Sequence, residues 1–142
     1  ISSPNGTKLV ALDELLIQAD YISLHIPKNK ETTNILGAEQ FAKMKDGVRI
    51  INCARGGVVN EDALYEALTS GKVAGAALDV FPEEPLPSNS PLWKLPNVLI
   101  SPHISGISNH YASRAVALFT DNLSRYLAGM ELLNLYNMGW GY

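Results

Sequence analysis

Short apolar runs alternate along this chain with stretches whose apolar residues recur at helical spacing. Each run is short enough to be a buried strand. We expect strands over residues 21–24, 48–52, 74–80 and 98–101, with a weaker candidate at residues 9–10. Strands that alternate with helices form a parallel sheet covered by those helices. The pattern therefore predicts an α/β fold.

Helical spacing predicts the intervening elements, which are residues 14–19, 38–44, 61–69 and 108 to about 128. Three of these helices begin near residues that can cap them through a side-chain oxygen, namely Asp13, Asn60 and Ser108. In the last helix, apolar residues recur every four positions from Tyr111 to Leu123, and we expect that face to be buried. Residues 81–96 hold five of the eight prolines and predict an ordered loop with a turn near Leu92.

Composition narrows the class of protein. Of the 142 residues, 46% are hydrophobic and 18% are charged, as in ordinary globular proteins. The net charge of −3 argues against general binding to nucleic acid or anionic membranes, which needs a basic surface. The single cysteine, Cys53, excludes an intrachain disulfide, and no cluster has metal-ligand spacing. No apolar run reaches the ~20 residues that span a bilayer, so we expect a soluble, cytoplasmic protein.

Charged side chains follow three of the predicted strands. Arg55, Glu84 and His103 lie in the segments Cys-Ala-Arg-Gly-Gly, Pro-Glu-Glu-Pro and Ser-Pro-His. The carboxyl ends of parallel strands meet at one edge of a sheet, where ligands bind. There an arginine can hold a carboxylate with two hydrogen bonds, and a histidine beside a carboxylate can move a proton. The sequence therefore predicts an active site at this edge.

Each of these residues has a plainer explanation when it is taken alone. Arg55 can be a surface arginine beside a Gly-Gly turn, Glu84 a solvated acid and His103 a structural histidine. Asp79, at the end of a strand of small apolar residues, can bind an amide or a hydroxyl, or cap nearby backbone. Cys53 has no neighbour that would activate its thiol, so we interpret it as a small residue near a ligand. The prediction that all three charged residues meet at one edge of the sheet is what favours a catalytic role.

One feature of a complete dinucleotide-binding domain is missing from this sequence. Such a domain begins with a strand that leads into a Gly-x-Gly-x-x-Gly turn at a helix N-terminus. This sequence contains no such turn and opens with a loop, Ile-Ser-Ser-Pro-Asn-Gly. We therefore expect the chain to begin in the middle of a domain.

Several further segments carry a resemblance to a known family. They read Ser-Leu-His-Ile-Pro at 23–27, Met-Lys-Asp-Gly at 44–47, Gly-Ala-Ala-Leu-Asp-Val-Phe at 75–81, Pro-Leu-Trp at 91–93 and Pro-Asn-Val at 96–98. With the three charged segments, and in this order, they resemble the D-isomer-specific 2-hydroxyacid dehydrogenases. The stretch around Glu84 is more similar to glyoxylate/hydroxypyruvate-reductase-like members. A glutamate at that position points away from the related formate dehydrogenases.

The resemblance implies an incomplete, Rossmann-like dinucleotide-binding domain with a parallel sheet, without its first two strands and Gly-rich turn. In the family's strand order, 3-2-1-4-5-6-7, residues 9–10 correspond to strand 3 and the four later strands to strands 4 to 7. Residues 1–129 are then the C-terminal part of the NAD(P)-binding domain. Residues 130–142 are expected to be a tail that packs on this body or on a substrate domain outside the chain.

The resemblance also implies an activity, which is hydride exchange between NAD or NADP and C2 of a 2-oxo or D-2-hydroxy acid. In that activity Arg55 binds the substrate carboxylate, His103 is the general acid/base and Glu84 is its carboxylate partner. Asp79 binds the nicotinamide carboxamide. The expected cofactor-binding residues are Ile26, Pro27, Cys53, Ala54, Arg55, Asp79, His103, Ser105 and Gly106. No metal is expected.

Two other functional classes stay open at this point. One is a nucleotide-sensing, corepressor-like binding module without significant turnover, and the other is an inactive remnant. The presence of Arg55, Glu84 and His103 together favours the enzyme. We expect a homodimer for the full-length protein and little activity from this chain alone. The sequence leaves open the choice of NAD or NADP and the identity of the acid.

Overall fold

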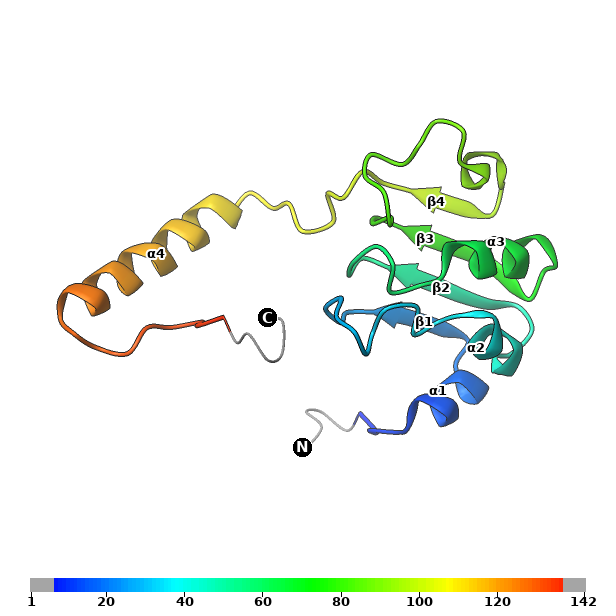
Figure 1. Cartoon of the computed structure of the whole chain (residues 1–142), viewed down its shortest axis with the longest axis horizontal. Coiled ribbons are helices and arrows are strands. Elements are labelled where there is room, and N and C mark those ends of the chain that lie inside the picture. Colours follow the sequence, from blue (N-terminus) through cyan, green and yellow to red (C-terminus); the bar gives the residue numbers. More distant parts are fainter. Residues whose placement is uncertain (1–6, 137–142) are drawn as a thin grey trace. The chain divides into compact units, whose positions relative to one another are not determined.

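The chain forms two compact units, one up to His103 and one from Ile104 onward. The structure, a computed structural model, describes residues 7–136. The second unit contains the helix α4, Tyr111–Leu127 (Figure 1). The elements of the first unit are α1 (Leu12–Gln18), β1 (Tyr21–Leu24), α2 (Ala38–Lys43), β2 (Val48–Asn52), α3 (Glu61–Thr69), β3 (Val73–Leu78), the 3₁₀ helix η2 (Pro91–Lys94) and β4 (Val98–Ile100).

The strands of the first unit form one parallel sheet. Within the described residues it has four strands, in the order β1-β2-β3-β4. This order confirms the arrangement expected for strands 4 to 7 of the family. The register pairs Leu24 with Asn52, Asn52 with Leu78, and Leu78 with Ile100. All four strands therefore end in one row, and the segments that follow them emerge side by side.

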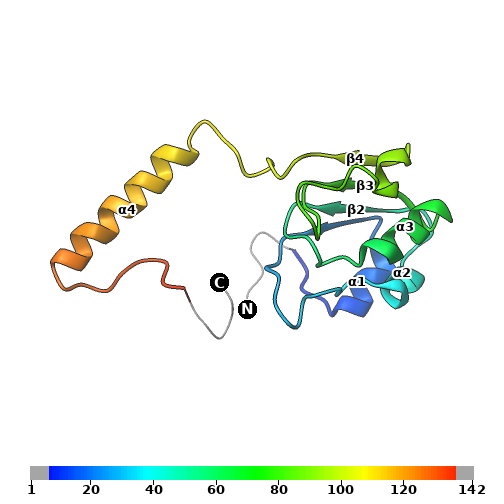
Figure 2. The same ribbon diagram turned by 45° about the horizontal axis from the view of Figure 1, so that its top comes forward.

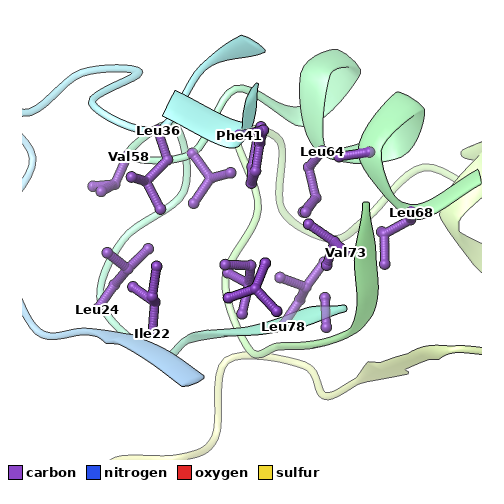
Figure 3. Close-up of a cluster of buried hydrophobic side chains, with 14 of the residues drawn as sticks. Ile22, Leu24, Leu36, Phe41, Val58, Leu64, Leu68, Val73 and Leu78 are labelled. Carbon is purple, nitrogen blue, oxygen red and sulfur yellow. The ribbon is translucent and has the colours of Figure 1, made fainter. Parts of the chain in front are cut away.

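The helices α1, α2 and α3 cover one face of this sheet (Figures 1 and 2). The core lies between them and the strands, because alternate residues of each strand point toward the helices (Figure 3). In β1, for example, Ile22 and Leu24 are buried whereas Tyr21 and Ser23 are exposed. The most deeply buried apolar side chains of the core are Leu16, Leu36, Ile50, Leu64, Leu92, Val48, Val58 and Val73.

The sequence predicted several element boundaries correctly. The bounds of β1, β2 and α3 are confirmed to the residue. Asn60 caps α3 as expected, since its side-chain oxygen accepts a hydrogen bond from the Ala63 N–H at 2.9 Å. Gly129 follows α4 with a φ of 66°, which is the left-handed conformation of a helix stop.

Two predictions near the start of the chain were wrong. Residues 9–10 form no strand, because nothing pairs with their backbone in the described sheet, whose edge on this side is β1. Asp13 is not the N-cap of α1, which is Ala11. Asp13 lies in the first turn and pairs with Lys43 of α2 at 2.8 Å, so its carboxylate is used between two helices.

Two strands are shorter than predicted. β3 runs from Val73 to Leu78, rather than over residues 74–80, and β4 ends at Ile100, one residue early. Both strands stop at the row defined by Asn52 at the end of β2. Asp79 and Ser101 therefore lie just beyond the sheet.

In the second unit, the predicted cap of α4 was wrong. The N-cap is His110 rather than Ser108, because the His110 carbonyl accepts the first helical hydrogen bond, from the Arg114 N–H at 3.0 Å. The apolar face is not buried either. Among the described residues no side chain of α4 is buried, and Tyr111, Phe119 and Leu123 are exposed. One helix and its flanking segments offer too little surface to cover that face.

The segment after α4 is held by one of the helix's side chains. The Asn122 amide donates to the Leu133 carbonyl at 3.1 Å and accepts from the Leu133 N–H at 2.7 Å. The rest of the predicted tail, residues 137–142, lies outside the described residues. The division of the chain at residue 129 stays a prediction.

Two kinds of feature are absent from residues 7–136. None of the helices described there is long and apolar enough to cross a membrane. The same residues contain no group of three His, Cys, Asp or Glu side chains arranged to hold a metal ion.

Candidate active site

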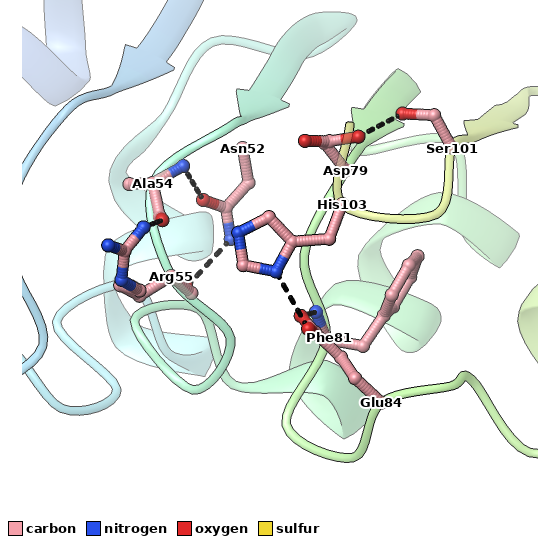
Figure 4. Close-up of polar contacts among 8 residues, drawn as sticks. All are labelled: Asn52, Ala54, Arg55, Asp79, Phe81, Glu84, Ser101 and His103. Carbon is pink, nitrogen blue, oxygen red and sulfur yellow. Dashed lines mark hydrogen bonds and ion pairs between the residues drawn. The ribbon is translucent and has the colours of Figure 1, made fainter. Parts of the chain in front are cut away.

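The segments that follow β2, β3 and β4 bring polar side chains to the carboxyl edge of the sheet (Figure 4). Arg55 lies three residues beyond the end of β2, and His103 three residues beyond the end of β4. Asp79 directly follows β3, and Glu84 lies in the loop that continues from it. The predicted residues of the first unit are thus gathered by the parallel register, at the edge where open α/β sheets bind ligands.

Glu84 and His103 form the central pair of the site. His103 Nδ1 lies 2.8 Å from Glu84 Oε2, and both side chains are partly exposed. An ionised carboxylate can only accept hydrogen bonds, so the shared proton lies on Nδ1, and Nε2 takes no part in this bond. The backbone of His103 has a φ of 55°, in the left-handed region that few non-glycine residues adopt. The bond to Glu84 therefore orients the imidazole on this unusual backbone conformation.

The loop around Glu84 keeps its carboxylate charged. Glu84 Oε1 accepts a hydrogen bond from the Phe81 N–H at 2.9 Å, and the peptide bond that follows, between Glu84 and Pro85, is cis. The hydrogen bond from the Phe81 amide, followed by that from His103, lowers the pKa of Glu84 below its usual value. The carboxylate is therefore ionised at neutral pH and can stabilise a positive charge on the imidazole.

Asp79 is a buried carboxylate at the same edge. Its side chain is 2% exposed, and the Ser101 hydroxyl donates to its Oδ1 at 2.5 Å. Its backbone N–H donates to the Asn52 carbonyl at 3.0 Å, which ties it to β2. The alternatives predicted for Asp79 included a hydroxyl partner, and the structure supplies one within the chain. Ser101, which the sequence left without a role, thus orients this carboxylate.

Arg55 is carried by a tight turn that Asn52 organises. The Asn52 side chain is buried; its Oδ1 accepts from the Ala54 N–H at 3.1 Å, and its Nδ2 donates to the Arg55 carbonyl at 3.3 Å. The guanidinium donates through Nη1 to the Ala54 carbonyl at 2.7 Å, and the residue is exposed. The sequence did not identify Asn52 as a functional candidate. A polar amide that ends a buried apolar strand was the available signal.

Gly56 brings the Arg55 turn against the Glu84 loop. A Cβ atom placed on Gly56 would overlap the Phe81 carbonyl and the Pro82 nitrogen. The two backbones therefore approach more closely than any side chain permits. This contact joins the turn that carries Arg55 to Phe81, whose N–H donates to Glu84, and to Pro82.

The remaining candidates lie in three places. Ile26 and Pro27 are half-buried in the segment after β1, and Cys53 and Ala54 belong to the Arg55 turn, where Cys53 is a free, half-buried thiol. Ser105 and Gly106 belong to the second unit and are not placed relative to this edge.

An apolar cavity of about 490 Å³ opens beside the Glu84–His103 pair. Its wall includes both members of the pair together with Phe81, Leu86, Trp93, Ile100 and Pro102. The Trp93 indole N–H donates to the Pro87 carbonyl at 2.9 Å, which fixes that side of the wall. The Glu84–His103 pair therefore borders an apolar space.

Comparison with known proteins decides the family. Residues 2–105 match the family model described as the NAD binding domain of D-isomer specific 2-hydroxyacid dehydrogenase. The chain belongs to this family. The resemblance drawn from the sequence is thereby confirmed, as is the prediction of a Rossmann-like, NAD-binding fold.

Individual relatives agree with the family assignment. The chain is 44% identical over 133 residues to a D-3-phosphoglycerate dehydrogenase of Archaeoglobus fulgidus, covering 94% of this chain and 25% of that protein. It is 42% identical over 132 residues to a glyoxylate reductase of Korarchaeum cryptofilum, covering 93% and 40%. The chain thus spans between a quarter and two fifths of the length of these two relatives.

A solved structure shares the fold. The D-isomer specific 2-hydroxyacid dehydrogenase from Xanthobacter autotrophicus, in complex with NADPH and MES, superposes with a TM-score of 0.86 at 40% sequence identity. The match covers 92% of this chain and 53% of that one. The family model is described as an NAD binding domain, whereas this solved structure contains NADPH.

We predict that Gly56→Ala destabilises the protein, because the added methyl group must displace the backbone at Phe81 and Pro82. Overpacking of this kind costs about 1–3 kcal/mol of unfolding free energy. Urea denaturation of the full-length gene product measures the change. Gly106→Ala is the matched control, since a Cβ there meets no atom within 4 Å. Equal midpoints for Gly56→Ala and wild type would contradict the close backbone contact.

We predict that the Glu84 carboxyl makes the stability of the fold depend on pH. Its carboxyl should titrate below the usual value of 4.5 in the folded protein. Because the folded pKa is the lower one, this group stabilises the fold above pH 4.5 and that contribution is lost as the pH falls through the folded pKa. In His103→Ala the titration should move up but stay below 4.5, since the Phe81 amide still donates. Carbon-detected NMR of the Glu84 carboxyl measures both midpoints, and an unshifted wild-type midpoint would refute the assignment.

Proposed function

We propose that this chain carries the catalytic residues of an NAD(P)-dependent dehydrogenase that interconverts 2-oxo acids and D-2-hydroxy acids. The observation that carries the proposal is the 2.8 Å pair of Glu84 and His103, at the same sheet edge as Arg55 and Asp79. A proton donor, a cation and a buried carboxylate at one ligand-binding edge match the needs of carbonyl reduction in a substrate that bears a carboxylate.

The residues at this edge fit a nicotinamide cofactor. Asp79 is buried and oriented by Ser101, and a carboxylate has lone pairs for more than one donor, so it suits the amide N–H groups of a carboxamide. We assign the other contacts to Ile26, Pro27, Cys53, Ala54, Arg55, His103, Ser105 and Gly106. When bound, the nicotinamide supplies or accepts the hydride.

Arg55 binds and orients the substrate in this proposal. Its guanidinium has five N–H donors in a planar fork, so the single bond to the Ala54 carbonyl leaves donors for a carboxylate. Two parallel hydrogen bonds fix the plane of the acid and therefore the direction of its C2 carbonyl. In well-oriented reactions, positioning of this kind can lower the activation free energy by about 7–11 kcal/mol.

His103 moves the proton. In the reductive direction its Nε2–H is donated to the carbonyl oxygen as that oxygen becomes a hydroxyl, and the imidazole is left neutral. In the oxidative direction the neutral imidazole takes the hydroxyl proton back. Glu84 holds the Nδ1–H throughout and stabilises the charged imidazole, because its own pKa is lowered and it stays ionised.

We further propose that the full-length gene product is a cytoplasmic homodimer that acts on small acids of the glyoxylate or hydroxypyruvate type and binds no nucleic acid. The net charge of −3 and the scattered lysines support the absence of nucleic-acid binding. Light scattering measures the oligomeric state.

Residues 2–105 lack a Gly-x-Gly-x-x-Gly turn, so we expect the isolated 142-residue chain to show no turnover.

The test of the proposed function is oxidation of NADH and NADPH by the full-length gene product with glyoxylate, hydroxypyruvate and pyruvate. We expect turnover with at least one acid, and His103→Ala should lower kcat by about 10²–10⁴-fold. His110→Ala is the control, because that imidazole makes no capping bond at α4. Tight NADH binding without turnover would instead support the corepressor-like binding module.

A further inference from the structure

We propose that Asn52 is a positioning residue, which acts on the substrate by fixing the turn that presents Arg55. The inference rests on the proposed function of Arg55 as the carboxylate-binding residue. It adds to that function a residue that touches neither substrate nor cofactor in the proposed mechanism.

The side chain of Asn52 holds both ends of one short backbone segment. Its Oδ1 accepts from the Ala54 N–H at 3.1 Å, and its Nδ2 donates to the Arg55 carbonyl at 3.3 Å. The amide is 2% exposed, so each bond replaces one to water that burial has removed. Because the two bonds use the donor and the acceptor of one rigid amide, they define the path of the backbone through Arg55.

Asn52 is itself firmly placed by the sheet. It is the last residue of β2 and pairs with Leu24 on one side and Leu78 on the other. Its carbonyl accepts the Asp79 N–H at 3.0 Å, which continues the ladder toward β3. The turn is therefore anchored to the sheet at the point where the strand ends.

A second anchor lies on the other side of Arg55. Gly56 packs directly against the backbone of Phe81 and Pro82, at the start of the loop that carries Glu84. Arg55 is thus held between the side chain of Asn52 and the close contact at Gly56. Loss of the Asn52 amide would release one of these two anchors and let the exposed guanidinium move relative to His103.

The chemistry of the turn requires an amide at this position. An aspartate retains the acceptor for the Ala54 N–H, but when ionised it has no hydrogen to give to the Arg55 carbonyl. An alanine retains neither. The two substitutions therefore separate the donor from the acceptor, and Asn52→Asp changes the volume of the side chain very little.

Steady-state kinetics of the full-length gene product, with NADH and glyoxylate, test the inference. We expect Asn52→Ala to lower kcat/KM for glyoxylate by about 10–100-fold, chiefly through a higher KM for the acid, since misplacing a binding group by ~1 Å has effects of this size. The KM for NADH should change much less. Asn52→Asp should shift the same parameter at least as far, because a carboxylate at this buried position turns an oxygen toward the Arg55 carbonyl. Asn52→Ser, which keeps a small neutral hydroxyl, serves as the variant if Asn52→Ala does not fold.

A double-mutant cycle separates positioning from a general structural role. If Asn52 acts through Arg55, the variant Asn52→Ala/Arg55→Ala should match Arg55→Ala in kcat/KM to within about twofold. A loss of kcat/KM in the double variant that equals the product of the two single losses would overturn the proposal. Asn60→Ala is the matched control, because it also removes an asparagine oxygen that accepts a hydrogen bond from a backbone N–H, that of Ala63 at 2.9 Å, but at the start of α3. It should leave the KM for glyoxylate unchanged.

Hydrogen exchange gives a readout that needs no turnover. The Ala54 amide should exchange faster in Asn52→Ala than in wild type, and Asn60→Ala should instead affect Ala63. Unchanged exchange at Ala54 would overturn the inference. Faster exchange at Ala54 in a protein that oxidises no NADH would instead refute the proposed function while upholding the control of the turn by Asn52.

Discussion

Parallel pairing places Leu24, Asn52, Leu78 and Ile100 side by side across the sheet, and every feature of the site depends on that register. A slip of one residue in any strand would reverse which side chains face the helices. It would also move the following turn along the edge by the length of a residue. The buried faces of the strands therefore fix the register, and the register brings together segments as far apart in the chain as those that follow Leu24 and Ile100.

Beyond the strand ends, the site is held by bonds from side chains to backbone. Asn52 binds the turn that carries Arg55, and Glu84 accepts the Phe81 amide within its own loop. Each bond satisfies a backbone group that the sheet no longer pairs. Ser101 acts differently, because it orients the buried Asp79 carboxylate. The polar residues around the site thus stabilise its loops and fix its geometry at the same time.

The parts of this structure that are encoded locally could be predicted from the sequence. The strand β2 follows from a short apolar run, and the capped helix α3 follows from helical spacing and Asn60. The convergence of Arg55, Glu84 and His103 follows from the rule for parallel sheets. Residues 9–10 could not be judged locally, since a strand exists only with a partner. Asn52 was missed because its role depends on the shape of a turn, which no spacing of residue types reveals.

We propose above all that Arg55 and His103 contact one substrate from the ends of β2 and β4, at the same edge of the sheet. A crystal structure of the full-length gene product with NADH and oxamate, an unreactive analogue of a 2-oxo acid, tests it most directly. We predict that the oxamate carboxylate lies on the Arg55 guanidinium, with the oxamate carbonyl oxygen about 2.6–3.2 Å from His103 Nε2. Oxamate bound away from either residue, in a complex that contains NADH, would contradict it.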